Sequence, residues 1–308
     1  QALNLVYSGA TVGWTPSSDI VNALEPVAPT TQLGVIAFGN SGSYTNLKNL
    51  VNSSAVVQAD VTGVGTVRNK LAASNYGGDK AVFAFGSDGN GELNLKNLCS
   101  NTGVISTDGT AVGTARGYLG AAPYGVGLAI FAYGQATGVV NTKNLVNNSG
   151  VIASDASGTG TARGACAAAG YGTDKAVFGF GYNGSSVINL ISNTGVQASD
   201  SGGTGTSRSR LGCATYDNDK AIFAFGFVDG TGNVAMSNLV SNTGVVAADV
   251  SAVASVRQDV YGTNIGSQAI MGYGDNSGVT GVTNIISTTG VVQSDVSVVG
   301  TARQAPAM

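Results

Sequence analysis

One motif occurs six times in this chain of 308 residues and restricts the folds that are open to it. In every copy an asparagine precedes an aspartate by 11 residues, and that aspartate precedes an arginine by 8 residues. Constant spacing without insertions indicates one structural unit of fixed length that is repeated along the chain. The six motifs are Asn49, Asp60 and Arg68; Asn97, Asp108 and Arg116; Asn144, Asp155 and Arg163; Asn189, Asp200 and Arg208; Asn238, Asp249 and Arg257; and Asn284, Asp295 and Arg303.

Each unit also contains a short apolar segment that ends in glycine, such as 81–86 (AVFAFG) and 221–226 (AIFAFG). Successive copies of this glycine are 47, 48, 47, 45 and 48 residues apart. Consecutive apolar residues predict a strand that is buried on both faces. Small residues follow each arginine, another strand surrounds each asparagine, and a valine-rich segment leads to each aspartate. The unit therefore predicts four short antiparallel strands.

A turn with a recurrent sequence separates the last two predicted strands of most units. It is Asn101-Thr102-Gly103 in one unit and Asn193-Thr194-Gly195 in another. Glycine in the third position suits a hairpin turn that needs a left-handed residue. The first unit carries Ala55 at this position, which leaves the form of its turn open.

Units of about 45–49 residues with four strands each are typical of a β-propeller. We therefore predict an all-β fold, a six-bladed β-propeller with four antiparallel strands per blade. Each unit begins at its own inner strand, so we expect the ring to close by packing of the first blade on the last. Residues 1–21 are predicted to form an extra strand or a docking arm, and residues 304–308 a C-terminal tail. The predicted propeller spans residues 22–303, with blades at about 22–68, 69–116, 117–163, 164–208, 209–257 and 258–303.

The order of these elements resembles the kelch repeat. It departs from the kelch repeat in two ways: a single glycine, not a pair, follows the aromatic strand, and the outer strand has no tryptophan. Some sequence segments of the repeat are similar to those of repetitive propeller-like proteins of tailed bacteriophages, among them SNTGVVAADV and NNSGVIASDASGTGTAR. The resemblance covers residues 22–303. It implies a viral structural protein in the tail, a tail fibre or the surface decoration of an extracellular virion.

Composition excludes several kinds of chemistry. The chain has no histidine, which removes Ser-His-Asp triads, histidine-ligated metals and imidazole acid–base catalysis. A net charge of −3 with a pI near 4.8 argues against nucleic-acid binding. The uncharged stretch 117–142 is rich in glycine and predicts two strands instead of a membrane span. We therefore expect no metal, no cofactor, no membrane insertion and no enzymatic activity.

The six Asp–Arg pairs have two interpretations. Arginines around a common centre suit an acid-binding site like that of six-bladed sialidases, which this architecture resembles superficially. Those enzymes need a nucleophilic tyrosine with a glutamate partner, but Glu25 and Glu92 are the only glutamates and occupy unrelated positions. Since every unit carries both partners, the pairs are interpreted as structural. Each arginine is expected to contact a carboxylate or main-chain carbonyls.

The loop between the second and third predicted strands is where the units differ most in length. The glycine and the motif asparagine are 10, 11, 10, 8, 12 and 10 residues apart. Loops that vary on a fixed scaffold often carry binding specificity, although they also drift without any ligand. Aromatic rings beside short polar groups suit sugar stacking. The candidate ligand-binding residues in these loops are Tyr44, Tyr182, Asn183, Phe227, Asp229 and Asp275.

These observations favour a non-enzymatic virion component that contacts a host cell-surface glycan, neighbouring virion proteins or copies of itself. The alternative is a cellular or secreted lectin-like propeller that binds carbohydrate as a monomer. Binding of a defined sugar by the isolated protein would favour the alternative. A fixed copy number in a larger assembly would favour the virion component.

Overall fold

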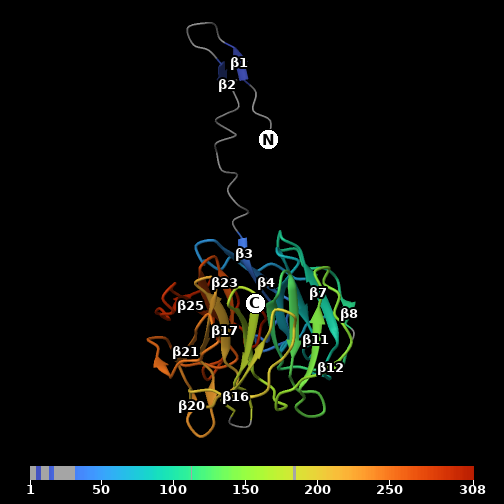
Figure 1. Ribbon diagram of the computed structural model, residues 1–308, viewed down its shortest axis with the longest axis vertical. Coiled ribbons are helices and arrows are strands. Elements are labelled where there is room, and N and C mark those ends of the chain that lie inside the picture. The colour runs from blue at the N-terminus through green and yellow to red at the C-terminus, as the bar shows by residue number, and fades with distance from the viewer. Residues whose placement is uncertain (1–4, 8–13, 17–31, 112, 183–184) are drawn as a thin grey trace. The chain divides into compact units, whose positions relative to one another are not determined.

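A computed structural model describes residues 5–7, 14–16, 32–111, 113–182 and 185–308 (Figure 1). The chain divides into two units, residues 1–31 and residues 32–308. In the first unit β1 (Leu5–Tyr7) pairs antiparallel with β2 (Trp14–Pro16). The second unit is built from strands throughout its described length, and no helix there is long and apolar enough to cross a membrane.

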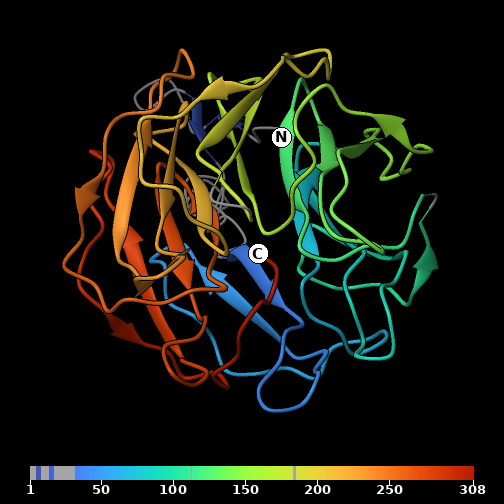
Figure 2. The same ribbon diagram turned by 90° about the horizontal axis from the view of Figure 1, so that it is seen from below.

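The second unit contains five four-stranded antiparallel sheets, which Figure 2 shows around a central axis. In each sheet the strands follow one another in space in chain order, and the fourth has only two residues. A hairpin of β19 (Phe227–Val228) and β20 (Gly232–Asn233) extends the fourth blade. The blades are β5 (Ala72–Tyr76), β6 (Lys80–Ala84), β7 (Leu95–Cys99) and β8 (Gly109–Thr110); β9 (Gly120–Tyr124), β10 (Leu128–Ala132), β11 (Thr142–Val146) and β12 (Ala156–Ser157); β13 (Ala167–Tyr171), β14 (Lys175–Gly179), β15 (Val187–Ile191) and β16 (Ser201–Gly202); β17 (Gly212–Tyr216), β18 (Lys220–Ala224), β21 (Met236–Val240) and β22 (Val250–Ser251); and β23 (Tyr261–Ile265), β24 (Gln268–Gly272), β25 (Val282–Ile286) and β26 (Val296–Ser297).

The β-propeller fold is confirmed, but the prediction of six blades is wrong, because the structure has five. The first repeat contributes a two-stranded sheet of β3 (Gln32–Ala37) and β4 (Lys48–Asn52). On its outer side Val61 forms an isolated bridge with Lys48. The segment 22–31, which was expected to supply its inner strand, lies outside the described residues. On its inner side Ala37 forms an isolated bridge with Ala307, which lies four residues after the last motif arginine.

The ring is joined through main-chain hydrogen bonds between β3 and the C-terminal residues. Ala37 and Ala307 each donate a hydrogen bond of 2.9 Å to the other's carbonyl oxygen, and Asn40 and Gln304 are paired in the same way. β3 also packs against β23 of the last blade, and Phe38 contacts Phe83 of the first blade. The expectation that closure relies on packing alone is therefore wrong.

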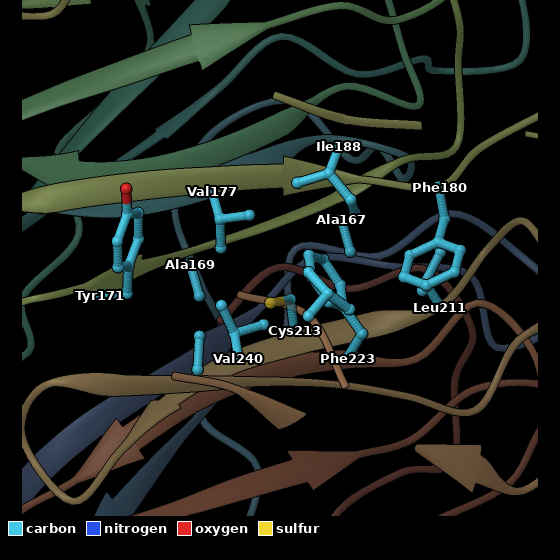
Figure 3. Close-up of a cluster of buried hydrophobic side chains, with 12 residues drawn as sticks. Ala167, Ala169, Tyr171, Val177, Phe180, Ile188, Leu211, Cys213, Phe223 and Val240 are labelled. Carbon is cyan, nitrogen blue, oxygen red and sulfur yellow. The ribbon is translucent and has the colours of Figure 1, made fainter. Parts of the chain in front are cut away.

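Apolar side chains between adjacent blades form the core, and Figure 3 shows the cluster between the third and fourth blades. Val177 and Ile188 of the third blade face Cys213 and Phe223 of the fourth (Figure 3). The Phe223 ring lies edge-on to Phe180 at 5.1 Å between centroids. Because each blade buries both faces against its neighbours, the second strand of each unit is apolar at consecutive positions, as predicted.

The recurrent hairpin turns have the left-handed third residue that the sequence predicts. Gly103 and Gly195 have φ values of 76° and 78°. Ala55 in the first repeat also adopts this conformation, at φ 59°. The turn therefore has the same backbone form in a repeat that lacks glycine, and the Cβ of Ala55 opposes it.

Replacing Ala55 with glycine is expected to stabilise the protein by up to about 1 kcal/mol, because glycine adopts positive φ without the steric cost of a Cβ. Ala153, an exposed residue without positive φ, is the matched control, and Ala153→Gly should be destabilising by about 0.5–1 kcal/mol. Urea unfolding followed by circular dichroism measures both values. A loss of stability in Ala55→Gly equal to that in Ala153→Gly would contradict the prediction.

Candidate functional site

The six motif arginines are buried, with at most 2% of the surface of each exposed. Arg208 is representative: its Nε donates to the Phe225 carbonyl oxygen at 2.9 Å and its Nη2 to Asn238 Oδ1 at 2.7 Å. Its guanidinium carbon lies 4.4 Å from the centroid of the Phe180 ring. Every motif arginine donates from Nη2 to the motif asparagine of the next repeat around the ring and stacks on an aromatic ring of its own repeat.

In five of the six described clusters the arginine forms an ion pair with the aspartate of the next repeat around the ring, and not with the aspartate eight residues before it. Arg68 Nη1 lies 3.7 Å from Asp108 Oδ1, and Arg208 Nη1 lies 3.7 Å from Asp249 Oδ1. The last arginine returns to the first repeat, with 3.8 Å between Arg303 Nη1 and Asp60 Oδ1. The ion pairs thus connect successive repeats around the ring, and the Arg303–Asp60 pair joins the last repeat to the first.

The aspartates of these clusters already accept hydrogen bonds from neighbouring residues of the protein. Asp249 Oδ2 accepts hydrogen bonds from the main-chain nitrogen and the hydroxyl of Thr206, while Oδ1 accepts one from Asn238. Burial raises the pKa of Asp249, but these hydrogen bonds and Arg208 outweigh it, so its pKa lies below the ordinary value. Burial lowers the pKa of Arg208 to about 10, which leaves it charged at neutral pH. The contacts are those of an internal structural connection.

A ring of main-chain hydrogen bonds lies two residues beyond the motif arginines. At each of the six positions a residue with positive φ donates its amide to the carbonyl of the equivalent residue in the preceding repeat. Tyr118 donates to Lys70 at 2.8 Å, for example, and Lys70 donates to Ala305 at 3.2 Å. We call this the amide ring. Its members are Lys70, Tyr118, Ala165, Arg210, Asp259 and Ala305.

The amide ring surrounds one end of a narrow central cavity. The cavity has a volume of about 50 Å³ and is lined by alanine, glycine and other residues of all five inner strands, with Met308. Tyr118, Arg210 and Asp259 line this cavity and also a wider hollow of about 330 Å³ outside it. We call the wider space the mouth hollow. It is lined by Asn40, Tyr44, Asn69, Lys70, Tyr118, Arg210, Gln258, Asp259, Asp275, Gln304 and Ala305.

Aromatic and cationic side chains form one wall of the mouth hollow. Tyr118 and Tyr182 pack edge-to-face at 5.6 Å, and Lys70 Nζ lies 4.7 Å from the centroid of the Tyr118 ring. Arg210 donates from Nε to the Tyr182 hydroxyl at 3.2 Å and from Nη1 to Gln258 Oε1 at 2.9 Å. These contacts fix the rings and the guanidinium in place, which prepares the wall for a ligand without a large entropic cost.

Two residues at the mouth hollow carry acceptors that no described donor satisfies: Asn69, whose Oδ1 is buried, and Asp259, through its carboxylate. Asp259 is 7% exposed, and its carboxylate takes part in no hydrogen bond or ion pair in the described chain. Burial raises the pKa of Asp259 to about 6, with Asp275 contributing and with Arg210 and Lys70 opposing the rise. Asn69 is 4% exposed and its Oδ1 has no partner in the described part. Buried acceptors without donors are uncommon in folded proteins.

The structure separates the residues that the variable loops suggested. Tyr44 and Asp275 line the mouth hollow, and Tyr182 contacts two residues of its wall. Phe227 and Asp229 line a different hollow of about 260 Å³, beside Ser209. The remaining candidate, Asn183, lies outside the described residues.

Sequence reasoning missed the residues of the amide ring. Lys70, Tyr118, Arg210 and Asp259 each stand two positions after a motif arginine, and the same position after Arg163 and Arg303 is occupied by Ala165 and Ala305. Alignment of the repeats would have shown that this position carries a large or charged side chain in four cases and alanine in two. Such variation at one position is a signal of a functional site. The segment was instead interpreted as a uniformly small inner strand.

No protein-family model matches this chain, and no curated protein sequence matches it. The structure supports the β-propeller fold, which is consistent with a binding or structural role.

Proposed function

We propose that this protein is a non-enzymatic binding propeller and that its ligand, a surface glycan, is held in the mouth hollow. The supporting observation is that the side chains lining the mouth hollow do not follow the repeat pattern of the motif clusters. In the six clusters the motif arginines and aspartates bind motif asparagines, whereas here aromatic rings and charged groups surround Asn69 Oδ1 and the Asp259 carboxylate, which no described donor satisfies. Aromatic faces beside polar groups with free hydrogen-bonding capacity are the features that suit a sugar.

We place this binding function in the virion of a tailed bacteriophage, as part of the tail, a fibre or the surface decoration. The support for that setting is the resemblance of the repeat wording to repetitive phage proteins. The glycan would then be one on the host cell surface, with neighbouring virion proteins as further partners. Detection of this chain in purified phage particles by mass spectrometry tests the setting. Its presence only in a cellular or secreted fraction would favour a lectin-like protein.

Loss of an aromatic ring from the mouth hollow is expected to weaken glycan binding about two- to tenfold, because an aromatic contact contributes about 0.5–1.5 kcal/mol. Tyr44→Ala and Tyr118→Ala are the test variants, since both rings line the hollow. Phe227→Ala removes a half-buried ring from the other hollow and is the matched control. Binding to immobilised bacterial surface polysaccharides is measured by biolayer interferometry.

Two outcomes would contradict the proposed function. One is equal binding by all three variants and the unaltered protein, which would place the ligand elsewhere. The other is release of shorter sugars from the bound polysaccharide, which would show that the protein is an enzyme.

A further inference from the structure

Asp259 is not needed for the part of the fold in which it lies. Its main-chain amide donates to the Arg210 carbonyl at 2.8 Å, and its carbonyl accepts from Ala305 at 3.2 Å. Ala165 and Ala305 make the same kind of main-chain bonds with a methyl side chain. The carboxylate of Asp259 is therefore an addition to a ring that forms without it.

This carboxylate opposes folding at neutral pH. A buried charged group without hydrogen bonds loses its hydration and gains little in return. The raised pKa of Asp259 expresses this cost, since the folded protein favours the protonated acid. Groups that reduce stability without a structural use are typical of functional sites.

The surroundings indicate what Asp259 is able to bind. Asp275 lies near enough to raise its pKa, while the two cations of the hollow already have partners: Arg210 donates to Tyr182 and Gln258, and Lys70 lies over the Tyr118 ring. A ligand carboxylate would therefore meet two carboxylates without a free cation to offset them. Asn69 Oδ1 adds another acceptor in the same hollow. A ligand that fits must therefore bring several donors and no negative charge, and the adjacent hydroxyls of a neutral sugar meet both conditions.

The size of the mouth hollow limits how much of a glycan it takes. Its volume of about 330 Å³ is at the lower end of ordinary ligand sites. The central cavity beyond the amide ring has only about 50 Å³, so a chain cannot thread through it. A glycan is thus expected to enter by its end.

We infer that the mouth hollow recognises the terminal neutral pyranose of a glycan, with Asp259 accepting hydrogen bonds from two adjacent hydroxyls and Asn69 Oδ1 from a third. This inference rests on the proposed glycan-binding function and narrows it to one class of sugar and one mode of entry.

Asp259→Asn tests the inference by two measurements on the same variant. On an array of oligosaccharides ending in glucose, galactose or mannose, affinity for the preferred glycan is expected to fall about 10- to 100-fold, because a hydrogen bond to a charged acceptor is lost. In urea at pH 7.5 the variant is expected to unfold at a higher midpoint than the unaltered protein. Asp229→Asn, in the other hollow, is the matched control for both measurements.

The stability gain has a defined pH dependence. The pKa of Asp259 is raised from 3.8 in the unfolded chain to about 6 in the folded one, so its cost is fully present above about pH 6 and disappears toward pH 4. The difference between Asp259→Asn and the unaltered protein should shrink over that interval. The charged and titratable groups facing Asp259 are Arg210, Lys70, Asp275, Tyr118 and Tyr261.

The outcomes distinguish this inference from the proposed function. Equal affinity of Asp259→Asn and the unaltered protein for a neutral glycan would overturn the inference and leave glycan binding intact. The same holds if arrays carrying the corresponding uronic acids bind more tightly. Lower stability of Asp259→Asn at pH 7.5 would show a structural carboxylate and also overturn it. No binding to any neutral or acidic glycan would overturn both.

Discussion

Replacing Arg208 with methionine is expected to destabilise the protein by about 3–5 kcal/mol, the usual cost of removing one partner from a buried ion pair. The substitution keeps most of the side-chain volume. It removes the hydrogen bonds that Arg208 donates to Asn238 Oδ1 and the Phe225 carbonyl, and it removes the ion pair with Asp249. Urea unfolding followed by circular dichroism at pH 7.5 measures the change in the free energy of unfolding.

The neighbouring Arg210 provides the control for this experiment. It is only partly buried and donates to Tyr182 and Gln258 at the edge of the mouth hollow. Arg210→Met is therefore expected to cost no more than about 1–2 kcal/mol. Equal destabilisation by the two substitutions would mean that the motif arginines have no special structural role.

Deletion of residues 304–308 is expected to cost about 6 kcal/mol, because six main-chain hydrogen bonds contribute about 1 kcal/mol each. Four of them join Gln304 to Asn40 and Ala307 to Ala37 of β3, and two place Ala305 in the amide ring. Ala307 is also fully buried against the core on the inner side of β3. A lower thermal midpoint and rapid proteolysis at the β3–β4 sheet are the expected results.

Gln304→Ala separates the role of the main chain from that of the side chain. The variant keeps the hydrogen bonds between residue 304 and Asn40, which involve main-chain atoms only. Its thermal midpoint should lie within about 1–2 °C of that of the unaltered protein. A deletion variant as stable as Gln304→Ala would show that the ring does not depend on its C-terminal residues.

The periodic part of the fold was accessible from sequence because each repeat carries its own local signals. The apolar segment 81–86, the turn at Gly103 and the small residues after Arg68 predict the strands and hairpins that the structure contains. The number of blades was predicted wrongly because the first repeat carries the sequence signals of the second and third strands of a blade. Its inner side is bridged by Ala307, from the other end of the chain. Residues 304–308 carry no repeat motif that would reveal this pairing.

The partners of the motif residues were not accessible in the same way. Asp60 stands eight residues before Arg68, yet Arg68 pairs with Asp108 and Asp60 with Arg303. Both spacings recur along the chain, so sequence distance cannot choose between them. The mouth hollow was found only in part, because Tyr44 and Asp275 lie in variable loops, whereas Lys70 and Asp259 lie in bends with positive φ just before the inner strands, and the sequence was interpreted there as inner strand.

The amide ring has a consequence for how this protein acquires new specificity. Its hydrogen bonds join main-chain atoms, and alanine, lysine, tyrosine, arginine and aspartate all occupy its six positions. Side chains there can be exchanged without changing the frame that presents them. A combinatorial library randomised at Lys70, Tyr118, Ala165, Arg210, Asp259 and Ala305 would therefore display a new recognition surface in each clone, on a scaffold that all clones share.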